Sequence, residues 1–322
     1  MKAPEYALLS QSERNGYTEE QHFGILLKYS ENGITKIAGN SNSYPFFQRS
    51  CMKPMQLAAV SEIFENFDFT NEEIAVMTAS HSGEDFHIKA VLSILKKIGL
   101  TENDLLCPPQ APLNEKSRNE LIKKTEIPSA IHNNCSGKHS AMLAYCVMKG
   151  FDTKNYTEIS HPLQKHVLSF VAEICGLKLS DCPISKDGCT LPVLATPLEN
   201  MARGFLNVYK NYPKIKNAVL ENPYFAGGHG RFDSEIMVAG GKNLVAKVGA
   251  GNLCCVADLA ELSCYVIKVL DGDNFARGLV MTEILKREGK LPDIKTSELE
   301  EMYPEVITDE TGFSVGEIKV MV

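Results

Sequence analysis

The chain has 322 residues, of which 44% are hydrophobic and 23% charged, so it is long enough to bury a core without disulfide bonds. Its net charge of −7 disfavours binding to nucleic acid and to anionic lipid, and no uncharged apolar run approaches the ~20 residues of a membrane-spanning helix. The first residues lack the apolar region of a secretory signal. These features predict a soluble, cytoplasmic protein with neither nucleic acid nor membrane as a partner.

The first predicted element is an antiparallel hairpin. Residues 22–29 and 34–39 have the composition of strands, and Asn32-Gly33 between them is typical of a type I′ turn. Helical spacing of apolar residues then predicts helices over 55–64, 87–98, 136–149, 161–175 and 201–219. Residues 243–249 and 253–257 indicate a second pair of strands, and a last helix is expected over 274–287.

Strands at both ends with helices between them favour an α+β fold. The chain has no internal repeat, low-complexity tract or Gly/Ser linker. We therefore expect one domain over residues 1–322. In it, a helical region at roughly 50–220 is inserted between the N- and C-terminal segments of an antiparallel sheet.

Ten cysteines occur in the chain, and without an export signal we expect them to be reduced. No Cys-x-x-Cys motif is present, and the closest two cysteines, Cys254 and Cys255, are adjacent. A metal held by these thiols would have to be bound by residues from distant segments.

Ser50 and Lys53 are the first candidates for chemistry, because a three-residue spacing puts both on one face of a helical turn, where a neutral lysine can take the serine proton. The spacing alone is weak evidence, since Ser93 and Lys96 repeat it inside an amphipathic helix. Ser50 differs because it opens a helix, whose free N–H groups favour a developing negative charge. The alternative is that Ser50 only caps the helix.

Two further motifs follow in chain order. Ser80 begins a Ser-His-Ser run, and Lys247 lies in a late strand two residues before Gly249. This order is similar to the Ser-x-x-Lys, Ser-x-Asn and Lys-Thr-Gly motifs of penicillin-recognising serine enzymes, although the strict second and third forms are absent. The pattern indicates acyl transfer through a serine ester, with lysine amines as proton carriers.

Two polar segments add more functional groups than packing requires. Residues 132–140 lead directly into an apolar helix, and residues 185–192 place Asp187 and Cys189 in a tight turn. Each segment alone is more typical of a turn, with Ser136 as the N-cap in the first.

Taken together, these segments resemble the thermolabile, Rhizobium-etli-type L-asparaginases, the asparaginase II family. The resemblance runs through most of the chain, and several of its matches are runs of consecutive residues. They are Arg14, His22, Arg49-Ser50, Lys53-Pro54, Gln56, Ala79-Ser80-His81-Ser82, Glu84-Asp85, His87, Asn134-Cys135-Ser136-Gly137-Lys138-His139, Asp187-Gly188-Cys189, Leu191-Pro192, Gly230-Arg231-Phe232, Lys247 and Gly249-Ala250.

The resemblance implies a homodimer with a serine β-lactamase/penicillin-binding-protein-like fold that hydrolyses L-asparagine to L-aspartate and ammonia. It implies two catalytic pairs, Ser50 with Lys53 and Ser80 with Lys247. We hypothesise that a neutral lysine activates one serine and that water hydrolyses the resulting β-aspartyl ester. Ser50 is slightly favoured as the nucleophile, with Ser80 and Lys247 as a proton relay.

By the same resemblance, Cys135, Lys138 and Cys189 match a zinc site. Two thiolates suit zinc, and a fourth position remains for water or substrate. Asp233 stands where the best-known member of the family has a third cysteine near the site, and its role is left open.

The expected substrate-binding residues are Arg49 and His139, as donors to the α-carboxylate, and Asp187, as the partner of the α-ammonium. One alternative is a zinc-dependent amidohydrolase whose serines only bind substrate. Others are a serine β-lactamase-like hydrolase of another amide, and a non-enzymatic amino-acid sensor. Cleavage of glutamine is not settled by the sequence.

Overall fold

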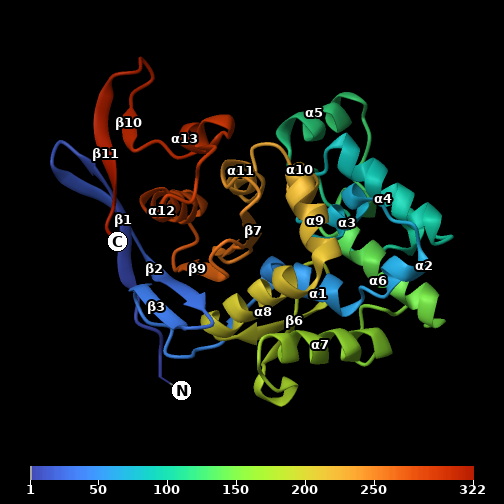
Figure 1. Cartoon of the computed structure of the whole chain (residues 1–322). Coiled ribbons are helices and arrows are strands. Elements are labelled where there is room, and N and C mark those ends of the chain that lie inside the picture. Colours follow the sequence, from blue (N-terminus) through green and yellow to red (C-terminus); the bar gives the residue numbers. More distant parts are fainter. Residues whose placement is uncertain (1) are drawn as a thin grey trace.

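The two ends of the chain form one antiparallel sheet in the computed structural model, which describes residues 2–322. Figure 1 shows the N-terminal strands in blue beside the C-terminal strands in red and orange. This confirms the predicted α+β class and the prediction that N- and C-terminal segments together form the sheet. In order across the sheet, the strands are β10 (Val306–Thr308), β11 (Ser314–Val320), β1 (Ala7–Arg14), β2 (Tyr17–Ser30), β9 (Ser263–Val269), β8 (Leu253–Asp258) and β7 (Leu244–Gly249), and β3 (Gly33–Ala38) also pairs with β2.

The hairpin of β2 and β3 is present as predicted, with Ser30 opposite Gly33. Its turn type differs from the prediction, because among the described residues only Gly33 in this turn has a positive φ, of 137°. The Asn-Gly turn with both φ angles positive is instead Asn15-Gly16, which joins β1 to β2.

Most predicted helices begin and end close to the expected residues. The prediction over 201–219 is wrong in being continuous, because Pro213 lacks the N–H that would extend the preceding helix. The helices of the predicted segments are α1 (Lys53–Ala59) and α2 (Ile63–Asn66), α4 (Asp85–Lys97), α6 (Ser136–Lys149), α7 (Pro162–Ile174), α8 (Leu198–Asn211) and α9 (Pro213–Glu221), and α12 (Asn274–Arg287). Within residues 2–322, no helix combines the length and apolar character needed to cross a membrane.

Other elements escaped the sequence analysis. The helix α3 (Asn71–Thr78) is buried on all sides from Glu73 onward, so it has no amphipathic period to detect. The remaining ones are α5 (Glu115–Lys123), α10 (Pro223–Ala226), α11 (Phe232–Ala239), α13 (Leu299–Met302) and a small sheet of β4 (Phe46–Phe47), β6 (Pro192–Thr196) and β5 (Ile184–Lys186).

Packing between these elements brings distant segments together. Both α8 and α12 pack on β9, and the side chains on both faces of β8 and β9 are almost all buried. On the helical side, Gly137 of α6 lies against the backbone carbonyl of Val76 in α3, where any Cβ would collide. This close crossing sets the residues that follow α3 beside those that precede α6.

Candidate active site

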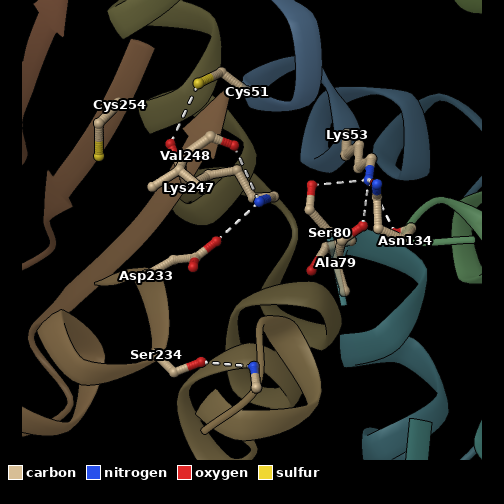
Figure 2. Close-up of polar contacts among 12 residues, drawn as sticks. Cys51, Lys53, Ala79, Ser80, Asn134, Asp233, Ser234, Lys247, Val248 and Cys254 are labelled. Carbon is tan, nitrogen blue, oxygen red and sulfur yellow. Dashed lines mark hydrogen bonds and ion pairs between the residues drawn. The ribbon is translucent and has the colours of Figure 1, made fainter. Parts of the chain in front are cut away.

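Lys53 is the centre of the candidate site. It begins α1 and is fully buried, and its Nζ donates to the Ala79 carbonyl oxygen at 2.6 Å, to Ser80 Oγ at 2.9 Å and to the Asn134 carbonyl oxygen at 3.3 Å (Figure 2). None of its partners among the described residues is a carboxylate. Burial therefore lowers the pKa of Lys53 from 10.5 to about 8, because the charged amine loses its hydration without gaining a counterion.

The serine that contacts Lys53 is not the one that the local motif favoured. Ser50 lies in a 3-10 turn, η1 (Arg49–Met52), and its carbonyl oxygen accepts the backbone N–H of Lys53. In the described chain, no hydrogen bond joins the Ser50 hydroxyl to the Lys53 amine. The amine reaches instead to Ser80, which follows α3.

Lys247 also has a partner other than the expected serine. Its Nζ lies 2.9 Å from Asp233 Oδ2 and 3.2 Å from the Val248 carbonyl oxygen, and both members of this ion pair are buried (Figure 2). Burial alone would raise the pKa of Asp233, but the charges of Lys247 and Arg231 lower it. Asp233, whose role the sequence left open, is therefore a carboxylate that holds Lys247 in place.

Strand β7 ties these groups to η1. The thiol of Cys51 donates to the Lys247 carbonyl oxygen at 3.2 Å, so the turn that carries Ser50 is fixed against the strand that carries Lys247 (Figure 2). Three separate segments, around residues 50, 80 and 247, thus meet in one region.

Two cavities adjoin at Ser50, Asn134 and Ala250, which line both of them. The first, here named the arginine cavity, has a volume of about 380 Å³, and its walls include Ser80, Arg231, Phe232, Arg277 and Tyr303. The second, here named the thiol cavity, has a volume of about 280 Å³, and its walls include Arg49, Gln110, Cys135, Asp187 and Cys189.

The expected metal ligands converge beside the thiol cavity. Cys135 occupies the N-cap position of α6, Lys138 lies in its first turn, and Cys189 approaches from the turn after β5, with its Sγ 3.1 Å from Lys138 Nζ. The neighbouring thiol of Cys135 and then the charge of Lys138 lower the pKa of Cys189, although burial alone would raise it. Two thiol groups at the edge of a cavity suit a zinc ion. Burial lowers the pKa of Lys138, but the charges of Cys189 and Cys135 raise it overall and favour its ammonium form.

This set differs from common metal sites in its third member. Among residues 2–322, no group of three or more His, Cys, Asp or Glu side chains is arranged to hold a metal. The amine of Lys138 would have to lose its proton to complete the site. Zinc binding therefore stays a prediction.

Two of the expected substrate-binding residues contact each other. Arg49 Nε lies 2.8 Å from Asp187 Oδ1, and both side chains line the thiol cavity. Arg49 has a φ of 48°, a left-handed conformation that costs about 1–2 kcal/mol outside glycine. Its surroundings hold it there, which is typical of a functional position.

His139 lies elsewhere. It is buried in α6, where its Nδ1 is 2.7 Å from the Tyr156 hydroxyl, and its Nε2 has no partner in the described chain. It is not among the residues that line either cavity. Burial lowers the pKa of His139, so a neutral imidazole fits this position better than a donor pair for a carboxylate.

Sequence reasoning missed three residues of the site. Asn134 belongs to a recognised run but was given no role; it contacts Lys53, and its Nδ2 donates to Gln110 Oε1 at 2.9 Å. Arg231 also belongs to a recognised run, whereas Arg277 lies in a helix without any motif. No local signal marks Arg277, because only the packing of α12 brings it to the cavity.

The chain was also compared with known proteins. A family model described as L-asparaginase II matches residues 11–320. No match was found among curated proteins. Among solved structures, a protein from Bacteroides dorei DSM 17855 that is provisionally described as a beta-lactamase has 11% identity and a TM-score of 0.46, over 82% of this chain and 92% of that one. Unliganded simvastatin synthase (LovD) from Aspergillus terreus has 8% identity and a TM-score of 0.36, over 86% of this chain and 93% of that one.

Proposed function

The chain belongs to the L-asparaginase II family, and from that premise we propose that it hydrolyses L-asparagine to L-aspartate and ammonia through a serine ester. The observation that carries the mechanism is the contact of 2.9 Å between the buried amine of Lys53 and Ser80 Oγ, at the wall of a cavity. A nucleophile and a base within hydrogen-bond reach are what acyl transfer requires.

The neutral form of Lys53 can also keep contacts with all three of its partners. A neutral amine has two N–H groups and one lone pair. The carbonyl oxygens of Ala79 and Asn134 can accept the two N–H groups, which leaves the lone pair for the hydroxyl proton of Ser80. These contacts favour Ser80 over Ser50 as the nucleophile.

The reaction then follows two steps. Ser80 Oγ bonds to the carboxamide carbon while its proton passes to Lys53, and the C–N bond breaks as the ammonium of Lys53 returns a proton to the departing nitrogen. This releases ammonia and leaves a β-aspartyl ester. In the second step, Lys53 takes a proton from water, the hydroxide oxygen bonds to the ester carbon, and the proton returns to Ser80 as aspartate leaves.

Lys247 serves as a fixed charge in this proposal. Its ion pair with Asp233 keeps it from acting as a proton relay. Burial has the largest effect in lowering the pKa of Lys53, and the charge of Lys138 in the metal-free protein and then the charge of Lys247 lower it further. Lys247 would thus help to raise the neutral fraction of Lys53 near physiological pH.

Cys135, Lys138 and Cys189 would hold a zinc ion, which supplies Lewis-acid polarisation at the edge of the thiol cavity when bound. In the same cavity, Asp187 and Arg49 offer a carboxylate and a guanidinium for the α-ammonium and α-carboxylate of asparagine. We also propose a homodimer, on the family resemblance alone.

The direct test is release of ammonia from asparagine, with glutamine and a β-lactam reporter as comparison substrates. We expect turnover of asparagine, and loss of turnover in Ser80→Ala. Mass spectrometry of acid-quenched enzyme should find the β-aspartyl group on the peptide that contains Ser80. An ester on Ser50 would reverse the roles of the two serines. Stoichiometric binding of asparagine without release of ammonia would contradict the proposal that the protein is an enzyme.

The pH profile tests the role of Lys53. Because only the neutral amine accepts the proton, kcat/KM for asparagine is expected to rise with pH up to about 8 and then level off. A profile that is flat between about pH 6 and 9 would contradict a Lys53 base. Ser50→Ala is the comparison variant, since its removal should leave the position of this transition unchanged.

Zinc binding is tested by metal analysis after dialysis. The wild type is expected to retain about one zinc per chain, and Cys189→Ser much less, because a thiolate ligand is lost. Cys182→Ser is a matched control, as Cys182 is also a buried free thiol. Equal zinc content in all three proteins would contradict the assigned ligands.

A further inference from the structure

The arginine cavity contains positive charge that no carboxylate in its walls balances. Arg277 has only 6% of its surface exposed; its NH1 donates to the neutral Asn274 Oδ1 at 2.7 Å, and its Nε has no partner in the part of the chain that is described. Arg231 Nε is likewise buried without a partner. Neither guanidinium forms a salt bridge with a described residue.

The other cations of the site are paired. Lys247 has Asp233, and Arg49 has Asp187, at 2.9 and 2.8 Å. A buried charge without a partner is costly, so Arg277, with the half-buried Arg231 on the same cavity wall, indicates a place for an anion. The guanidinium of Arg277 also lies over the Phe232 ring at 5.9 Å, which fixes its orientation.

The position of the arginine cavity narrows the identity of that anion. The α-carbon of asparagine carries both charges, and only the thiol cavity offers both a carboxylate and a guanidinium, Asp187 and Arg49. The described lining of the arginine cavity includes no carboxylate to receive an ammonium. If the α-carbon binds in the thiol cavity, the carboxamide would lie near the shared wall at Ser50, and its nitrogen would be directed toward the arginine cavity.

Ammonia fills only a small part of a cavity of about 380 Å³. We propose that the arginine cavity is a subsite for a leaving group that carries a carboxylate, so that the protein also cleaves β-aspartyl amides of amino acids, which are β-aspartyl dipeptides. This inference rests on the proposed asparagine hydrolysis. The chemistry is unchanged: the C–N bond breaks, Lys53 protonates the departing nitrogen, and an amino acid leaves in place of ammonia.

Three substrates test the wild-type protein. The leaving group of L-asparagine is ammonia, the smallest of the three. That of β-aspartyl-glycine is glycine, which carries a carboxylate, and that of N4-ethyl-asparagine is ethylamine, which is similar in length to glycine but has no carboxylate. We expect kcat/KM for β-aspartyl-glycine to exceed that for N4-ethyl-asparagine about tenfold or more, because hydrogen bonds to a charged group are strong. Equal values, or no cleavage of β-aspartyl-glycine while asparagine is hydrolysed, would overturn the subsite.

The two arginines are tested by the same ratio. Arg277→Gln and Arg231→Gln are each expected to reduce the preference for β-aspartyl-glycine over N4-ethyl-asparagine about tenfold. Arg287→Gln is the matched control, since Arg287 lies on the same helix but its side chain is exposed. If Arg277→Gln does not fold, the subsite is still tested by Arg231→Gln and by the ratio of kcat/KM for β-aspartyl-glycine to that for N4-ethyl-asparagine in the wild type. An unchanged ratio in a folded Arg231→Gln protein would overturn the assignment.

Failure of the subsite and failure of the proposed function give different results. Ammonia from asparagine without any preference for the charged leaving group removes the subsite alone. Cleavage of β-aspartyl-glycine without ammonia from asparagine supports the subsite and removes asparagine as the substrate. If neither substrate is cleaved, both proposals are wrong.

Discussion

Lys53→Met is expected to lower kcat for asparagine about 10³-fold, because the proposed mechanism loses its only base beside Ser80. The protein should stay folded. A lysine whose pKa falls from 10.5 in the unfolded chain to about 8 in the folded one destabilises the fold by roughly 3 kcal/mol below pH 8, and methionine removes that penalty. Ammonia release and urea unfolding at pH 7 measure the two effects separately.

The pH dependence of stability separates the effect of Lys53→Met on folding from its effect on catalysis. Between pH 8 and 10.5 the unfolded chain binds the proton that the folded protein has lost, so wild-type stability rises with pH in this window. Lys53→Met should lack this rise. Lys89→Met is the control, since Lys89 is exposed. Activity of Lys53→Met within tenfold of wild type would contradict the mechanism.

Asp233→Asn is expected to lower the free energy of unfolding by about 3–5 kcal/mol, because it leaves the buried ammonium of Lys247 without its counterion. The double variant Asp233→Asn, Lys247→Met should recover much of this loss, since it buries no charge. Urea unfolding of the wild type, the single variants Asp233→Asn and Lys247→Met, and the double variant at pH 7 gives the coupling between the two residues.

The pH dependence of stability and a variant of an exposed ion pair both check the predicted effect of Asp233→Asn. The pKa of Asp233 is lowered in the folded protein, so its stabilisation is complete above its unfolded value and is lost as the pH falls through the folded one. Asp85→Asn removes an exposed ion pair with Lys89 and should change stability by about 0–1 kcal/mol. An Asp233→Asn protein as stable as Asp85→Asn would contradict a buried pair.

The sequence predicted which segments take part better than how their side chains pair. Apolar periodicity located α4, α6, α7 and α12 almost to the residue, and the motifs named Lys53, Ser80 and Asp187. Helical spacing placed Ser50 near Lys53, but the amine turns to Ser80 because the crossing of α3 and α6 surrounds it with acceptors. That crossing depends on contacts between segments about sixty residues apart, which no local pattern contains.

Asp233 and Arg277 illustrate the same limit. A carboxylate and a guanidinium in helices are ordinary on a surface, and only tertiary packing makes them buried neighbours of a cavity. The sequence also predicted His139 as a substrate ligand, whereas its side chain lines neither cavity. A motif match identifies residues but not the direction of their side chains.

The contact of Gly137 with Val76 has a consequence for how this protein fails under stress. The acceptors around the amine of Lys53 belong to two backbones, one on each side of that contact. A slight separation of α3 from α6 would admit water to the amine, restore its hydration and return its pKa toward 10.5, so that much less of the amine would be neutral at pH 7. The base would then be lost while the secondary structure was still intact, so we expect heating to reduce activity before it unfolds the helices.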